Sequence, residues 1–193
     1  MQTATQRGLA KVTFLIDPSV SRFTVQAFAT GLLSAFGHNP TIGIRDYDGE
    51  IQCVPETYEK AFLRVTVRTG AMDVLDEIKS DDRRKLEQLM YQEVLDISRF
   101  PTAVYESREI GIQKLSNELF LARVNGELSF HGVTQNHSFE ARVTDMRAML
   151  RISGEFSLRQ SDYGIKPVSF AAGALRLKDE IKFKFELAGR VQD

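Results

Sequence analysis

Apolar and polar residues alternate at period two along most of the chain, which is the pattern of β-strands with one dry and one wet face. In the clearest run, residues 181–187, the odd positions are apolar and the even positions are charged. The same alternation recurs over residues 22–27, 63–68, 120–130, 138–143 and 152–158, and less cleanly over residues 104–108. About seven or eight such strands must close around a common interior, as a barrel or a two-sheet sandwich. The charged alternate positions exclude a parallel sheet covered by helices.

One segment departs from this alternation. From Ser80 to Ile97 the apolar residues recur at helical spacing, at positions 86, 89, 90, 94 and 97. We expect Ser80 to cap the N-terminus of this helix and Phe100-Pro101 to end it. The sequence therefore predicts an all-β domain with one inserted amphipathic helix, at about residues 81–97.

Three dipeptides contain the glycines that tight reversals or bulges use. They are Asp48-Gly49, Asn125-Gly126 and His131-Gly132. We expect each of them to interrupt the regular course of a strand.

The chain has 193 residues, and 25 Lys and Arg stand against 26 Asp and Glu, for a formal net charge of -1. This balance excludes a general nucleic-acid binder, which carries a basic excess. We expect a flexible N-terminus over residues 1–11 and a single domain over residues 12–193. Since we find neither a run of about 18 apolar residues nor a secretory signal, we expect no membrane span and a cytoplasmic location.

Cys53 is the single cysteine, which excludes an internal disulfide and a multi-cysteine zinc site, and we expect a packed thiol. Strand parity places His137 on the inner side with Phe139, near one rim, and His131 on the outer side. A three-histidine metal site needs all three rings to converge, and parity places His131 and His137 on opposite sides of the wall. We therefore predict that the chain has no metal ligand and no catalytic residue. A metal-binding or enzymatic barrel that uses His38 and His137 remains the alternative.

Phenylalanine and small residues dominate the inward positions of the predicted strands. A filled core explains them, and so does a hollow one, since barrels of about eight strands lie at the boundary between the two. A hollow lined in this way suits a long apolar ligand. Burying one five-carbon isoprene unit yields up to ~4 kcal/mol at ~0.8 kcal/mol per carbon. Association costs ~4–15 kcal/mol, so tight binding needs about three or more units. These inward positions are Phe23, Phe120, Phe130, Phe139, Phe156, Phe183 and Phe185, with Ala27, Ala103, Ala122, Gly126 and Ala141 among them.

Eight short fragments lie in order along nearly the whole chain. They are Phe14-Leu-Ile-Asp-Pro-Ser19, Phe23-Thr-Val25, Arg99-Phe-Pro101, Tyr105-Glu-Ser107, Gly126-Glu-Leu-Ser, Gly132-Val-Thr134, Ser161-Asp-Tyr-Gly-Ile165 and Asp179-Glu-Ile181. In this order they resemble the opening aromatic-x-Ile-Asp element and the turn and strand-start elements of the YceI-like family of lipocalin-like, polyisoprenoid-binding barrels.

The resemblance implies an antiparallel eight-stranded lipocalin-like barrel with a tunnel for a polyisoprenoid or isoprenoid-quinone-like lipid, which it sequesters or transports without catalysis. It implies no cofactor beyond this lipid, and a homodimer is a possible assembly. The helical insertion can cover one tunnel mouth. Tyr105, Ser107 and His137 are the candidates to meet a polar head group. The full set of expected ligand-binding residues is Phe23, Val25, Val65, Tyr105, Ser107, Phe120, Leu128, Phe130, His137, Phe139, Phe156, Phe183 and Phe185. A filled barrel that acts as a protein-interaction module is a third interpretation.

Overall fold

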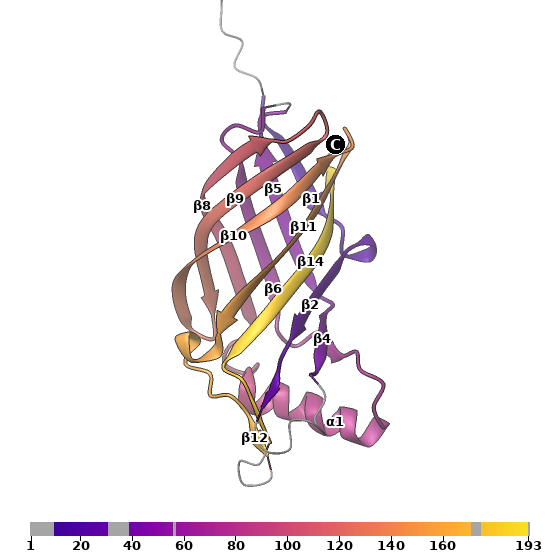
Figure 1. Cartoon of the computed structure of the whole chain (residues 1–193), viewed down its shortest axis with the longest axis vertical. Helices are drawn as coiled ribbons and strands as arrows, with labels where there is room; N and C mark the ends of the chain where they lie inside the picture. Colours follow the sequence, from indigo (N-terminus) through magenta and orange to yellow (C-terminus); the bar gives the residue numbers. More distant parts are fainter. Residues whose placement is uncertain (1–9, 31–38, 56, 171–174, 193) are drawn as a thin grey trace, which may run out of the picture.

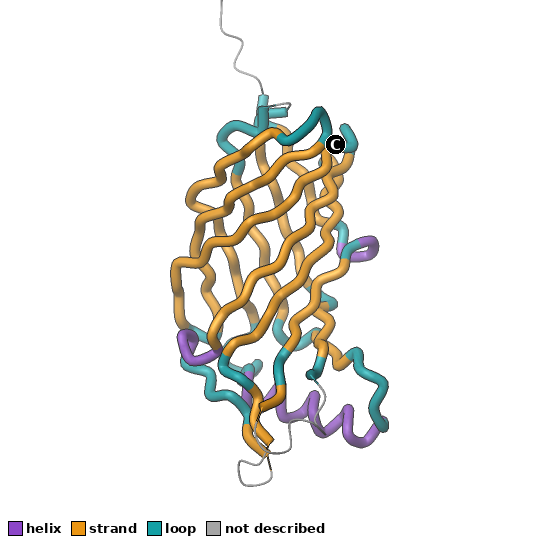
Figure 2. Tube along the Cα trace, viewed as in Figure 1, coloured by secondary structure: helices purple, strands orange, loops and turns teal. Residues whose placement is uncertain are grey.

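The computed structural model describes residues 10–30, 39–55, 57–170 and 175–192. Strands make up most of it, and one helical segment lies between β7 and β8 (Figure 2). The strands are β1 (Val12–Ile16), β2 (Arg22–Gln26), β3 (Ala29–Thr30), β4 (Thr41–Ile44), β5 (Tyr47–Cys53), β6 (Phe62–Arg68), β7 (Met72–Val74), β8 (Thr102–Lys114), β9 (Leu119–Phe130), β10 (Val133–Asp145), β11 (Met149–Arg159), β12 (Ser169–Phe170), β13 (Leu175–Leu177) and β14 (Glu180–Val191). The helical elements are η1 (Pro18–Val20), α1 (Ser80–Leu89), η2 (Met90–Val94) and η3 (Gln160–Tyr163).

The main sheet closes on itself as the predicted eight-stranded antiparallel barrel. Its strands follow the order β1-β5-β6-β8-β9-β10-β11-β14, and β14 pairs back to β1. The end of β14 pairs with β1, with Ile16 opposite Gly189, and its earlier part pairs with β2, with Phe23 opposite Phe185. Strands β2, β4 and β7 thus extend the wall toward the end where α1 lies (Figure 1).

A β-bulge in β8 accounts for the irregular alternation around residue 105. The register between β8 and β9 shifts between Ser107 and Glu109, opposite Gly126. A Cβ at Gly126 would lie 2.3 Å from the carbonyl oxygen of Glu106, so only glycine allows this approach. Asn125-Gly126 therefore serves a bulge and not a reversal.

The expectation that Asp48-Gly49 interrupts a strand is wrong. Both residues lie inside β5. A Cβ at Gly49 would lie 2.5 Å from Cδ1 of Ile16, so this glycine makes room for a side chain of the neighbouring strand.

His131 and Gly132 form the two-residue connection between β9 and β10, with φ of 50° and 76°. Two positive φ values are typical of the hairpin turns that match strand twist. The sequence predicted that His131 lies on the outer side, and in the structure this residue is half-buried. Its ring lies 4.3 Å from that of Phe100, and its Nδ1 is 3.1 Å from the carbonyl oxygen of Tyr163. The turn conformation, and not strand parity, sets its direction.

The helix is shorter than predicted and is not capped by Ser80. α1 begins with Ser80 as its first helical residue, after Lys79, which makes no side-chain capping bond. It ends at Leu89 and continues as one π-helical turn, η2, that ends at Val94 and not at Ile97. Asp81 and Asp82 lie in the first turn, where negative charge complements the helix dipole.

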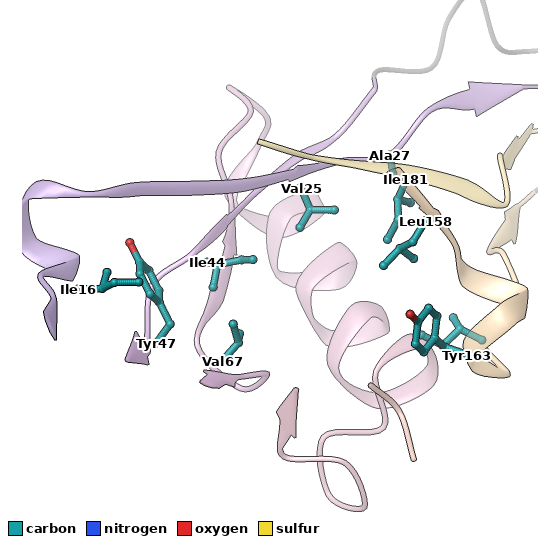
Figure 3. Close-up of a cluster of buried hydrophobic side chains, with 10 residues drawn as sticks. Ile16, Val25, Ala27, Ile44, Tyr47, Val67, Leu158, Tyr163 and Ile181 are labelled. Atoms are coloured by element: carbon teal, nitrogen blue, oxygen red, sulfur yellow. The ribbon is translucent and has the colours of Figure 1, made fainter. Parts of the chain in front are cut away.

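Buried apolar side chains line the inside of the barrel in connected clusters. The largest contains Ile16, Val25, Ala27, Ile44, Tyr47, Val67, Leu158, Tyr163, Ile165 and Ile181. Those labelled in Figure 3 come from several strands, from the residue after β2 and from η3, and they face a common interior. A second cluster, Phe14, Cys53, Tyr58, Phe120 and Leu150, lies at the opposite end from α1.

Candidate ligand-binding cavity

A cavity of about 250 Å³ runs through the barrel interior. It extends from Cys53, Tyr58 and Phe120 at one end to the helical segment at the other, where Leu86 and Met90 line it. In the part of the chain that the structure describes, its lining is aliphatic and aromatic apart from Cys53, the tyrosines and Gln160, and it includes no Asp, Glu, Lys, Arg or His. Such a surface offers a ligand apolar contact and few hydrogen bonds.

Five phenylalanines form one wall of this cavity, which we call the Phe wall: Phe23, Phe139, Phe156, Phe183 and Phe185. They come from the neighbouring strands β10, β11, β14 and β2, so they stand side by side instead of meeting across the barrel. The rings of Phe156 and Phe183 stack at 4.7 Å, and Phe139 stacks on Phe156 at 5.5 Å.

Strands β6, β8 and β9 present side chains of mixed size to the cavity. Val65, Ala103 and Ala122 are small, whereas Tyr105, Phe120 and Phe130 are large. The Tyr105 ring lies 5.3 Å from the ring of Phe139 in the Phe wall. Parity along single strands could not show this arrangement, because it does not say which inward residues lie next to one another around the barrel.

The structure places every predicted site residue on the cavity lining except Ser107 and His137. Whether the lining residues contact a ligand remains a prediction. The residues on the lining are Phe23, Val25, Val65, Tyr105, Phe120, Leu128, Phe130, Phe139, Phe156, Phe183 and Phe185.

The three polar candidates make contacts within the barrel wall. The Tyr105 hydroxyl donates to the carbonyl oxygen of His137 at 3.0 Å. The Ser107 hydroxyl oxygen accepts from the backbone N–H of Leu63 at 2.8 Å. The His137 imidazole packs on Phe156 with ring centroids 4.8 Å apart, and its buried Nε2 has no partner among the described residues. None of the three is therefore presented to the cavity as a free polar group.

Three titratable side chains in and around the cavity, those of Tyr105, Cys53 and His137, are neutral near neutral pH. Burial raises the pKa of Tyr105 to about 12. Burial, and next the carboxylate of Asp145, raises the pKa of Cys53 to about 11. Burial also lowers the pKa of His137. The fully buried Cys53 is a packed thiol, as predicted. A charged ligand group would find no counter-charge among the described residues of the lining.

Sequence reasoning missed several lining residues. Ile110 and Ile112 line the cavity because the bulge after Ser107 moves the inward positions of β8 from odd to even numbers. The one available signal was Gly126, whose missing side chain permits the bulge. Tyr58 and Gln160 lie in connections between strands, where period-two alternation does not predict whether a side chain points into the barrel.

The alternative site built on His38 and His137 gains no support. His38 lies outside the described residues, and His137 packs on Phe156. Within the described ranges, no group of three His, Cys, Asp or Glu side chains could hold a metal ion. Nor does any helix of that part have the length and apolar character needed to cross a membrane.

The model of the YceI-like domain matches residues 14–188. The chain therefore belongs to the YceI-like family, and its lipocalin-like barrel is the fold of that family. Among curated proteins, no sequence matches this chain.

Solved structures share this fold at low sequence identity. BcnA of Burkholderia cenocepacia aligns with a TM-score of 0.68 at 14% identity, over 90% of this chain and 98% of its own. A polyisoprenoid binding domain of Saccharophagus degradans, described as implicated in plant cell wall breakdown, aligns with a TM-score of 0.67 at 12% identity, over 95% and 99%. The YceI protein of Campylobacter jejuni aligns with a TM-score of 0.60 at 14% identity, over 81% and 87%.

Proposed function

We propose that the barrel binds a linear apolar molecule of the isoprenoid class in its cavity, and that it sequesters or carries this molecule without catalysis. One observation carries the proposal: the interior is hollow and is lined along its length by neutral, mostly apolar side chains. The description of a structurally similar domain as polyisoprenoid-binding supports the isoprenoid class. A branched prenyl chain offers only carbon and hydrogen to such a wall, so it leaves no buried polar group unpaired.

The cavity volume sets a scale for the ligand. A cavity of roughly 150 Å³ holds one benzene molecule, which has six carbons. At the same cavity volume per carbon atom, the 250 Å³ of this cavity holds about ten carbons, or two isoprene units. Burying ten carbons gives about 8 kcal/mol, of which association uses at least ~4 kcal/mol. We therefore expect a ten-carbon prenol to bind weakly, and longer chains to bind more tightly only as the barrel widens to admit them.

Native mass spectrometry of the protein, purified without detergent and titrated with prenols of two to six units, tests this function. We expect one prenol bound per chain. Phe139→Asp, which puts a carboxylate into the Phe wall, should abolish binding, because a charge in an apolar site is costly. Ser138→Asp is the matched control, since Ser138 is exposed on the outer side of the same strand.

Two results would refute the proposed function. One is a wild-type protein that binds no prenol below about 1 mM, which corresponds to about 4 kcal/mol. The other is a folded Phe139→Asp variant that binds as well as the wild type.

A further inference from the structure

The helical segment 80–94, which we call the cover, closes one end of the cavity from outside. Leu86, Leu89, Met90 and Val94 line the cavity. No residue of α1 is buried, and the charged residues at positions 81, 82, 84 and 85 are exposed. The cover therefore lies across the end of the barrel, as Figure 1 shows, with only its apolar face toward the interior.

The cover is held to β7 by side chains and not by strand pairing. β7 pairs with β4 along one edge, with Gly43 opposite Asp73. Successive residues of a strand direct their backbone groups to alternate edges. Met72 and Val74, on either side of Asp73, therefore direct their backbone groups away from β4. A neighbouring strand would normally bond to such an edge.

Two side chains of the cover bond to this second edge of β7. The Tyr91 hydroxyl accepts from the backbone N–H of Met72 at 3.1 Å and donates to the carbonyl oxygen of the same residue. A carboxylate oxygen of Glu87 accepts from the backbone N–H of Val74 at 3.0 Å. We call these bonds the latch. They can break without unpairing any strand.

The cover also ends in a conformation that is rarely seen in helices. The π-helical turn η2 closes with a bond from the N–H of Leu95 to the carbonyl oxygen of Met90 at 2.8 Å. Asp96 follows with a φ of 42°, in the left-handed region, before the chain reaches β8. π-Turns are frequently found at functional sites.

The other end of the cavity is packed shut. Cys53 and Leu150 are exposed by 0% and 1%, and Tyr58 and Phe120 by 6% and 4%. The Tyr58 and Phe120 rings lie 4.7 Å apart. Opening this end would break apolar contacts across several strands. Among the described residues, opening the cover breaks the latch, the 2.8 Å bond from Arg83 to the carbonyl oxygen of Asp76, and the contacts of one helical face.

We propose that the end under the cover is the portal through which the apolar chain enters and leaves, and that the latch controls the rate of this exchange. The inference rests on the proposed function. It also assigns an orientation, because the described lining offers no counter-charge and the far end of the cavity is closed. The polar end of the ligand therefore stays at the portal, under the cover. Ligands with one polar terminus fit this arrangement, and ligands that are polar at both ends do not.

Stopped-flow fluorescence with naphthalene, an uncharged apolar probe whose ten carbons match the cavity volume, tests the portal on the full chain. Tyr91→Phe removes the latch hydroxyl and keeps the ring, and Glu87→Met removes the latch acceptor. Losing one such bond should raise the association and dissociation rate constants together by about two- to tenfold. The dissociation constant should stay unchanged, because the latch closes over the empty and the loaded barrel alike.

Two matched variants control for general loosening of the barrel. Glu87→Gln keeps an oxygen acceptor at the latch. Ser116→Ala removes a hydroxyl that accepts from the backbone N–H of Leu119 at 3.2 Å, in the connection before β9 at the closed end, and Ser116 does not line the cavity. Both variants should exchange the probe at the wild-type rate. Unchanged rates in Tyr91→Phe and Glu87→Met, or an equal acceleration in Ser116→Ala, would overturn the portal and leave the proposed function intact. A wild-type protein that binds neither the probe nor a prenol would refute the proposed function itself, and the portal with it.

The orientation is tested with a prenol that carries a photoreactive diazirine beside its hydroxyl group. Peptide mapping after illumination should find the label on residues 80–95. A label on residues 53–58 would overturn the assigned orientation.

Discussion

Filling the hollow from a small residue of β8 should remove ligand binding without unfolding the barrel. Ala103 lies on β8 opposite Val67 of β6 and lines the cavity. The Ala103→Phe substitution places a six-carbon ring in a cavity of 250 Å³. Such a ring occupies roughly 150 Å³ of that volume. Room then remains for about four of the ten carbons of a short prenol. The six carbons lost represent ~5 kcal/mol at ~0.8 kcal/mol each.

A loss of this size exceeds the net ~4 kcal/mol at most that a ten-carbon prenol gains, so its binding should become undetectable. Isothermal titration calorimetry with a ten-carbon prenol, or displacement of a fluorescent apolar probe, measures it; the chain has no Trp to interfere with the fluorescence. Val104→Phe, on the next residue and facing outward, is the matched control and should bind like the wild type. A folded Ala103→Phe variant whose dissociation constant stays within threefold of the wild-type value would refute the account of the cavity.

Two further predictions concern buried titratable groups. Burial lowers the pKa of His137 below its ordinary value of 6.5, so as pH falls below about 6.5 the unfolded chain takes up a proton there before the folded chain does. The free energy of unfolding should therefore decrease on acidification, by at most ~1.4 kcal/mol per pH unit from this group. The Tm of His137→Leu should fall less between pH 7.5 and 5.5 than the Tm of the wild type. Equal falls in Tm would contradict this prediction. Burial also raises the pKa of the fully buried Cys53 to about 11. At pH 8, mass spectrometry should therefore find no iodoacetamide adduct on the folded protein and one adduct per chain on the protein unfolded in guanidinium chloride. Rapid labelling of the folded protein would show that this end of the cavity opens.

The sequence alone predicted the barrel well, because one side of nearly every long strand is dry. Residues 181–187 alternate without a break, and they form part of β14, which pairs with three other strands. The spacing of Leu86, Leu89, Met90 and Val94 likewise predicted a helix with one apolar face, and that face lines the cavity.

The sequence could not show where local geometry departs from regular periods. The bulge after Ser107 depends on the missing side chain of Gly126 in the neighbouring strand. The half-buried position of His131 depends on a turn with positive φ that packs the ring against Phe100. In both cases a residue distant in sequence decides the outcome.

Hollow and filled barrels share the same alternation, so parity could not distinguish them. Strand tilt and stagger set the diameter of the barrel. The pairing order then decides that Phe156 and Phe183 stack on one wall while Ala103 lies on a strand that pairs with neither of theirs. That arrangement became visible only once the strands were placed in order.

A crystal structure of the protein soaked with a prenol that carries bromine at its apolar end tests the central claim most directly. We predict an anomalous bromine peak inside the barrel, beyond the Phe wall and toward Tyr58, with the chain running back to the cover. Bromine found only on the outer surface, or an interior in which side chains have closed the hollow, would contradict the account.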